Sequence, residues 1–165
     1  ETLAVLRDYE RGPQIFSRVA SVKVRSRNEA FAITEQKNVV RALGLSYEST
    51  IVFKTQQQRI SADEALSTFV MIDSDGTTKS VNGGWRLKAV TVKGQGAVYL
   101  EYYNSMLVAP RFPLQLQIMK AFGQGDYEKV VRELGAAVQA HRAQSGPGSG
   151  QSHSQLTAKV RETTI

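Results

Sequence analysis

Glu101 is the strongest candidate for a chemical role, because of the residues beside it in the sequence. It alternates with Tyr99 and Tyr103 in a segment typical of a β-strand, so these three side chains share one face. If that face points into the protein, the carboxylate needs a partner and could anchor a polar ligand group or transfer a proton. If the face points outward, Glu101 pairs instead with a Lys or Arg on a neighbouring strand.

Other patterns for catalysis or metal binding are weak. The chain has no cysteine, which excludes disulfides, thiol nucleophiles and Cys-ligated metals. Its histidines, His141 and His153, have no acidic partner near them in sequence. Residues 73–76 (DSDG) begin like a calcium loop, but Gly84 stands where the last acidic ligand is needed, so they predict a turn. We therefore expect no metal ion and no cofactor.

The elements that would position these residues are a run of strands followed by a helix. Short helices are predicted near the N-terminus, over 2–7 and 13–16. Two-residue alternation then predicts strands over 19–25, 29–36, 49–55, 68–73, 85–92 and 97–104. Beyond Pro113 the apolar period changes to that of a helix, with a short helix over 114–122, a break at the glycines 123 and 125, and a long helix over 126–143.

Apolar side chains on one face of these elements could enclose a ligand. The candidates on the strands are Phe31, Ile33, Ile51, Phe53, Trp85, Leu87, Tyr99, Glu101 and Tyr103, and those on the long helix are Val131, Leu134 and Val138. Ligand pockets are mostly apolar with a few polar groups, which fits this set. The alternative is that the same residues fill a packed core that has no cavity.

The last segment of the chain has an unusual order. Residues 144–154 are rich in Gly and Ser and predict a flexible linker, whereas residues 156–165 alternate again and contain many β-branched residues. A strand that follows a loose linker needs a sheet edge or a gap to occupy.

The N-terminal half of this pattern resembles the START-like superfamily, which includes polyketide cyclase/dehydrase and coenzyme-Q-binding proteins. The residues that carry the resemblance are Leu6, Asp8, Tyr9, Glu10, Pro13, Phe16, Val19, Val22 and Val24. Residues 84–87 (GWRL) and 99–102 (YLEY) extend it, and it covers about residues 2–143. The resemblance implies an α+β helix-grip fold, in which a curved antiparallel sheet wraps around the long helix within a single domain, 1–165.

The resemblance also implies a cavity between sheet and helix for a hydrophobic or amphipathic small molecule such as a lipid, quinone or polyketide. One reading is a binding protein without catalysis. The other is a cyclase/dehydratase-type enzyme that uses a pocket carboxylate or tyrosine. We expect binding rather than catalysis.

One departure from the family concerns its first strand, which normally precedes the first helix. That strand is missing before Glu1, and a suitable one stands at residues 155–165. We therefore predict a circular permutant in which 144–154 is the joining loop and Ile165 lies close to Glu1. The alternatives are a strand that swaps into a neighbouring chain and a disordered tail.

The net charge of +6 gives little information about partners. Lys and Arg are dispersed along the chain, which favours solvated surfaces over a specific nucleic-acid site and leaves contact with an anionic membrane surface open.

No apolar run is long enough to span a bilayer, and no N-terminal signal is present, although the chain starts at Glu1 rather than Met and a lost targeting segment stays open. We expect a monomer, with a strand-swapped dimer as the alternative; the compartment stays open.

Overall fold

The computed structural model describes residues 1–42, 45–76, 78–108, 113–144 and 156–162. Three short helical elements open the chain: α1 (Thr2–Arg7), the 3-10 turn η1 (Tyr9–Arg11) and α2 (Gly12–Ile15). Six strands follow, namely β1 (Val19–Arg27), β2 (Phe31–Ala42), β3 (Leu45–Arg59), β4 (Glu64–Ser74), β5 (Thr78–Val92) and β6 (Gln95–Val108). The long helix α3 (Pro113–Gln144) and the strand β7 (Leu156–Glu162) complete the described chain.

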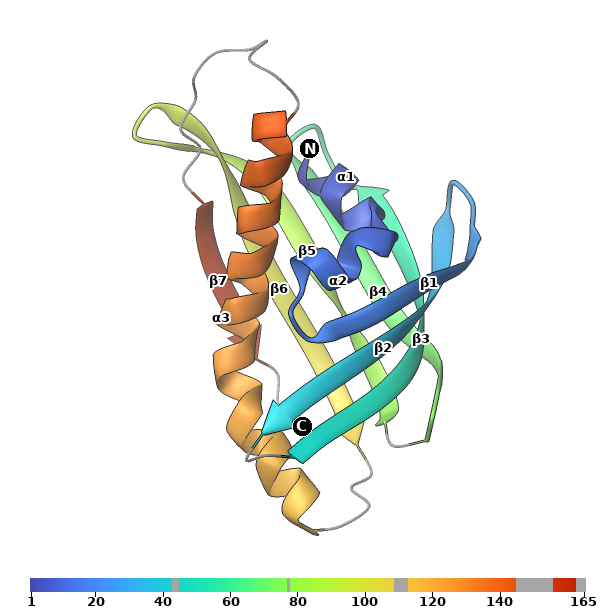
Figure 1. The fold of residues 1–165 in the computed structure, drawn as a ribbon. Helices are drawn as coiled ribbons and strands as arrows, with labels where there is room; N and C mark the ends of the chain where they lie inside the picture. The colour runs from blue at the N-terminus through green and yellow to red at the C-terminus, as the bar shows by residue number, and fades with distance from the viewer. Residues whose placement is uncertain (43–44, 77, 109–112, 145–155, 163–165) are drawn as a thin grey trace.

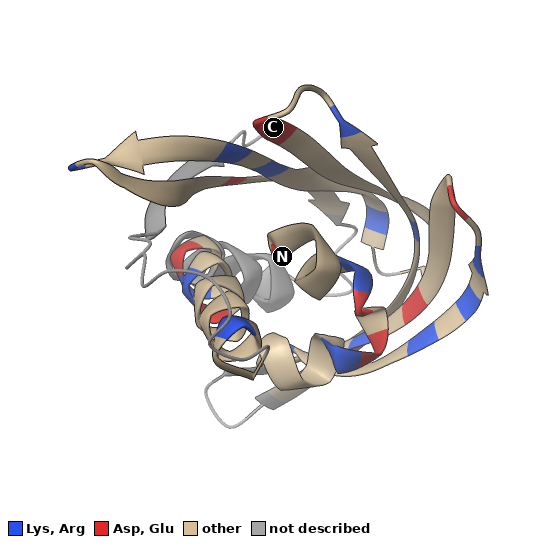
Figure 2. Cartoon of the chain, turned by 90° about the horizontal axis from the view of Figure 1, so that it is seen from above, with Lys and Arg blue, Asp and Glu red and all other residues tan. Residues whose placement is uncertain are grey.

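The strands form one sheet in chain order, β1 to β7. Each pair from β1 to β6 is antiparallel, because each strand is joined to the next by a tight connection. Seen from above, the sheet is an arc with α1 inside it and α3 along its open side (Figure 2). The predicted α+β fold, with a curved antiparallel sheet and one long helix, is confirmed for these elements.

Two predicted boundaries differ from the structure. Gly83 and Gly84 lie inside β5 rather than before it, since Gly83 pairs with Asn104 of β6. The two helices predicted around Gly123 and Gly125 are one continuous helix, α3. A glycine inside a helix costs only about 1 kcal/mol relative to alanine, and the packing of the later turns of α3 against the sheet offsets that cost.

The core lies where α1 and α3 meet the strands β4–β6. Its buried members are Val5, Ala65, Trp85, Leu87, Leu100, Val131, Leu134 and Val138. The predicted helix stripe is therefore correct, because Leu134 is fully buried and its neighbours on α3 are 3% exposed. We call the sheet face that contacts α1 and α3 the inner face, and the opposite one the outer face.

The course of β7 does not confirm the predicted permutation. Residues 156–162 do form a strand, but it runs parallel to β6, from a start opposite Val98 to an end opposite Asn104. That end is level with Tyr102, which contacts Tyr127 on α3. Glu1 is ion-paired with Arg142. Along α3, Arg142 lies about four helical turns, or about 22 Å, beyond Tyr127.

The end of β7 and the start of α1 therefore lie at opposite ends of the molecule, and Figure 1 shows the N-terminus beside the last turns of α3. Residues 163–165 lie outside the described residues, so the predicted closeness of Ile165 to Glu1 is not tested. The first strand that would lead directly into α1 therefore stays a prediction. The alternation pattern of residues 156–165, on which this prediction depends, indicates a strand but not the direction in which the strand runs. Residues 145–155, most of the predicted joining loop, lie outside the described residues.

Candidate functional site

Strand pairing decides which side chains share the inner face. On β5 and β6, Leu87 pairs with Leu100 and Trp85 pairs with Tyr102, and these residues pack against the helices. Because side chains alternate along a strand, the same face continues onto β4 and β3 through Phe69 and its neighbours. The inner face of β2 to β6 thus includes Ala32, Thr34, Ile51, Phe53, Thr55, Gln57, Ala65, Ser67, Phe69, Met71, Gly83, Trp85, Leu87, Leu100, Tyr102 and Asn104.

Seven of the residues predicted to line a pocket face the interior. On the sheet these are Ile51, Phe53, Trp85 and Leu87, and on α3 they are Val131, Leu134 and Val138. Trp85 is 5% exposed and Leu87 is 6% exposed, so both belong to the packed core as well as to the inner face.

The other five predicted residues lie on the outer face, and their predicted inward orientation is wrong. On β6, Leu100 and Tyr102 occupy the inner positions, which turns Tyr99, Glu101 and Tyr103 outward. On β2, Ala32 and Thr34 occupy the inner positions, so Phe31 and Ile33 point outward.

Glu101 lies on the outer face beside a basic residue of a neighbouring strand, as the second of the two interpretations of its strand predicts. It is directly opposite Arg86 on β5, and the nearest partner of that guanidinium is Glu64, at 2.7 Å. The hydrogen bond to Glu64 is the main cause that raises the pKa of Arg86, and the charge of Glu101 adds to it. Glu101 is therefore a member of an outer-face charge cluster, and it cannot serve a ligand on the inner face.

A continuous row of aromatic rings crosses the inner face. Trp85 lies 4.6 Å from Tyr102 between ring centroids, and Phe16, just after α2, stacks over Trp85 at 6.5 Å. Tyr102 also contacts Tyr127 of α3 at 5.7 Å and Phe69 of β4 at 6.3 Å. Phe69 in turn meets Phe53 edge-on at 5.5 Å. The row therefore links the end of α2, α3 and the strands β3 to β6.

Several members of this row were missed from the sequence pattern. Tyr102 and Phe69 are not among the candidates that the sequence pattern offers, although both lie on predicted strands. The alternation over 97–104 places apolar residues on both faces of the strand, so it gives no signal for the side that is buried. Phe16 and Tyr127 are joined to the row by tertiary packing alone.

The polar groups within the row are few. Burial raises the pKa of Tyr102 well above its usual value, so its phenol stays protonated at neutral pH. Burial also lowers the pKa of Arg18, opposed by the nearby Tyr127 and Glu133. The Oδ1 atom of Asn104 is buried without a hydrogen-bond partner. Such groups can orient a ligand by hydrogen bonds but are poorly suited to transfer protons.

Within the described ranges there is no cluster of three or more His, Cys, Asp or Glu residues that could hold a metal ion. In the same part of the chain, no helix has the length and apolarity needed to cross a membrane. His141 lies near the end of α3, and His153 lies outside the described residues.

Comparison with known proteins finds similarity in structure but not in sequence. No family model matches the chain, and no curated protein matches it. A Thermus thermophilus protein, TTHA0849, superposes with a TM-score of 0.58 at 12% identity, over 88% of this chain and 90% of that chain. A fragment of a STAR-related lipid transfer protein from Xanthomonas axonopodis gives a TM-score of 0.55 at 17% identity, over 80% of this chain and 76% of that one. The fold of the chain is therefore START-like.

Proposed function

We propose that this protein binds a hydrophobic or amphipathic small molecule on the inner face, between the sheet and α3. The observation that carries the proposal is the aromatic row and its apolar continuation toward the end of β6. Phe53, Phe69 and Met71 are only partly buried, and Met106 is 45% exposed on the same face. Exposed apolar surface on a concave face is typical of a ligand site.

The structural neighbour described as a lipid transfer protein supports the same ligand class. Lipids, quinones and polyketide-like molecules all combine an apolar body with a small polar group, which suits a face with many rings and few polar atoms. A polyketide cyclase/dehydrase or coenzyme-Q-binding subtype remains part of the proposal. The enzyme alternative is weaker because Glu101, its proposed carboxylate, lies on the outer face.

The proposal can be tested with the chain's only tryptophan. Trp85 lies inside the aromatic row, so a ligand on the inner face should change its fluorescence. We expect a saturable change on titration with oleyl alcohol, which is a tail with a neutral head. A change that does not saturate would contradict the proposal.

Two adjacent residues of β6 provide a matched pair of variants. Met106 is 45% exposed on the inner face, and Leu107 is 58% exposed on the outer face. Met106→Glu should weaken binding by about tenfold or more, because the ligand would bury a charge. Leu107→Glu introduces the same charge on the other side and should leave the affinity unchanged. Equal effects of the two variants would place the ligand elsewhere.

A further inference from the structure

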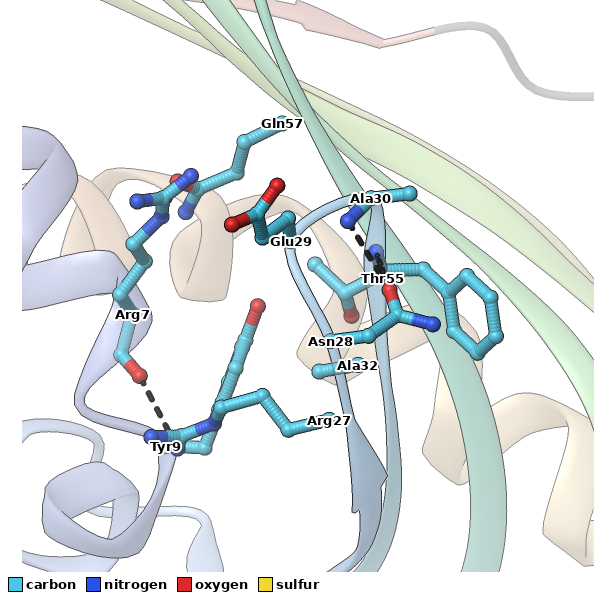
Figure 3. Close-up of a pocket in the computed structure, with 10 residues that line it drawn as sticks. Arg7, Tyr9, Arg27, Asn28, Glu29, Ala30, Ala32, Thr55 and Gln57 are labelled. Atoms are coloured by element: carbon cyan, nitrogen blue, oxygen red, sulfur yellow. Dashed lines mark hydrogen bonds between the residues drawn. The ribbon is translucent and has the colours of Figure 1, made fainter.

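A separate pocket lies beyond the aromatic row, where α1 and η1 face the β1–β2 hairpin and β3 (Figure 3). Its volume is about 260 Å³, enough for a small polar group and the first atoms of a chain. Seven of the ten residues that line it have polar side chains, among them Arg7, Tyr9, Arg27, Glu29, Thr55 and Gln57.

The two arginines of the pocket are held in different ways. Arg27 donates to Glu10 at 3.1 Å and to the carbonyl oxygen of Arg7 at 3.4 Å, and its guanidinium lies 5.3 Å from the ring centroid of Tyr9. Arg7 donates from Nε to the Oε1 atom of Gln57. This single contact orients the Arg7 guanidinium and leaves its Nη groups available to a ligand.

Hydrogen-bond donors outnumber acceptors around the pocket. The Nε2 atom of Gln57 is buried and has no hydrogen-bond partner. Burial raises the pKa of Tyr9, so its hydroxyl keeps its proton, and Thr55 adds a second, buried hydroxyl. An amide, two hydroxyls and a guanidinium together favour a ligand group with several acceptor oxygens.

The carboxylate of Glu29 lies beside this space. It lies in the turn between β1 and β2, and Figure 3 shows its carboxylate directed toward Arg7 and Gln57. Because Glu29 is an exposed turn residue, its side chain can move aside when another anionic group enters.

The pocket adjoins the inner face of the sheet. Ala32 and Thr55 belong to both, and Thr55 is the direct cross-strand neighbour of Phe69 in the aromatic row. A molecule whose tail lies along Phe69 can therefore reach the pocket with its head group.

We propose that this pocket binds the anionic head group, a carboxylate or phosphate, of an amphipathic ligand whose tail occupies the inner face. This inference rests on the proposed function, since the inner face must first bind the tail. Arg7 supplies the charge, and Gln57, Tyr9 and Thr55 supply the neutral donors.

The test compares ligands that have the same oleyl tail and different head groups. Oleate, monooleyl phosphate and oleyl alcohol are titrated into the protein, with Trp85 fluorescence as the readout. Arg7→Met should weaken the binding of oleate and of monooleyl phosphate by about tenfold, as expected for the loss of a charge-assisted hydrogen bond. The affinity for oleyl alcohol should stay unchanged. Arg132→Met is the matched control, because it removes an exposed charge of the same type from α3, away from the pocket. Glu29→Gln should strengthen oleate binding by removing a competing charge.

The outcomes separate this inference from the proposed function. If oleate and oleyl alcohol bind equally and Arg7→Met affects neither, the head-group site is wrong while binding on the inner face stands. If no tailed ligand binds, both proposals fail. Inorganic phosphate, titrated alone, identifies the source of the anion: binding as tight as that of monooleyl phosphate would overturn a lipid head-group site. Should Arg7→Met fail to fold, Arg7→Lys keeps the charge and should retain the preference for oleate.

Discussion

Tyr102 connects more parts of the molecule than any other residue of the aromatic row. It contacts Trp85 and Phe69 within the sheet and Tyr127 on α3. A phenolate at this position would be desolvated, which is why burial raises the pKa of the hydroxyl. Tyr102 therefore contributes to stability as a protonated phenol, and its contribution must depend on pH.

The pH dependence has a definite sign. In the unfolded chain Tyr102 ionises near its usual pKa of 10.0, whereas in the folded protein it ionises at a higher pH. Its contribution is fully present below pH 10 and is lost as the pH rises above that value, because only the unfolded chain then releases the proton. The free energy of unfolding should fall between about pH 9.5 and 11, with Tyr102 contributing up to about 1.4 kcal/mol per pH unit.

Urea denaturation of the wild type and Tyr102→Phe over this range measures that contribution. The variant should show the shallower loss of stability, because one titrating group has been removed. Identical slopes in the two proteins would show that Tyr102 is not buried as described.

Strands were easier to predict from sequence than the faces they present. Residues 97–104 alternate aromatic and aliphatic side chains on both sides of β6, so the apolar pattern alone leaves the buried side open. Leu100 decides the side through its contacts with residues distant in sequence, on α1 and α3. The α3 stripe was predictable because only one side of its second half is apolar.

The close pairing of β5 with β6 leads to a prediction at the glycine of β5 that faces inward. A Cβ atom at Gly83 would meet the carbonyl oxygen of Tyr103 and lie 2.7 Å from the Cζ atom of Phe69. Gly83→Ala should therefore destabilise the protein by about 1–3 kcal/mol, as overpacked sites do. A Cβ atom at Gly96 would meet nothing within 4 Å, so Gly96→Ala should change stability by less than about 0.5 kcal/mol. Chemical denaturation measures both, and equal stability of the two variants would mean that β5 and β6 are packed less closely here.

At the scale of the whole molecule, β7 is the part that sequence could locate but not orient. It pairs with β6 at the last edge of the sheet and runs parallel to it. The charges could be anticipated as dispersed, since Lys, Arg, Asp and Glu are spread over the strands and helices that Figure 2 colours. Ion pairs such as Arg25–Glu35 and Lys37–Glu48 join neighbouring strands.

Removal of β7 should alter how the protein associates. Deletion of residues 145–165 leaves the long strand β6 as an unpaired edge, and such edges pair with other chains. Sedimentation velocity should show concentration-dependent self-association of the shortened chain that exceeds that of the full chain. The same sedimentation and stability for both chains would show that β7 does not protect the edge.

Ligand binding on the inner face is tested most directly by proton NMR contacts between a bound tail and the protein. With oleyl alcohol bound to the full chain, we predict intermolecular NOEs from the tail methylenes to the ring protons of Phe53 and Phe69 and to the methyl group of Met71. Tyr99 and Tyr103, on the outer face, should show none. NOEs confined to the outer-face tyrosines, or none at saturating ligand, would contradict the account.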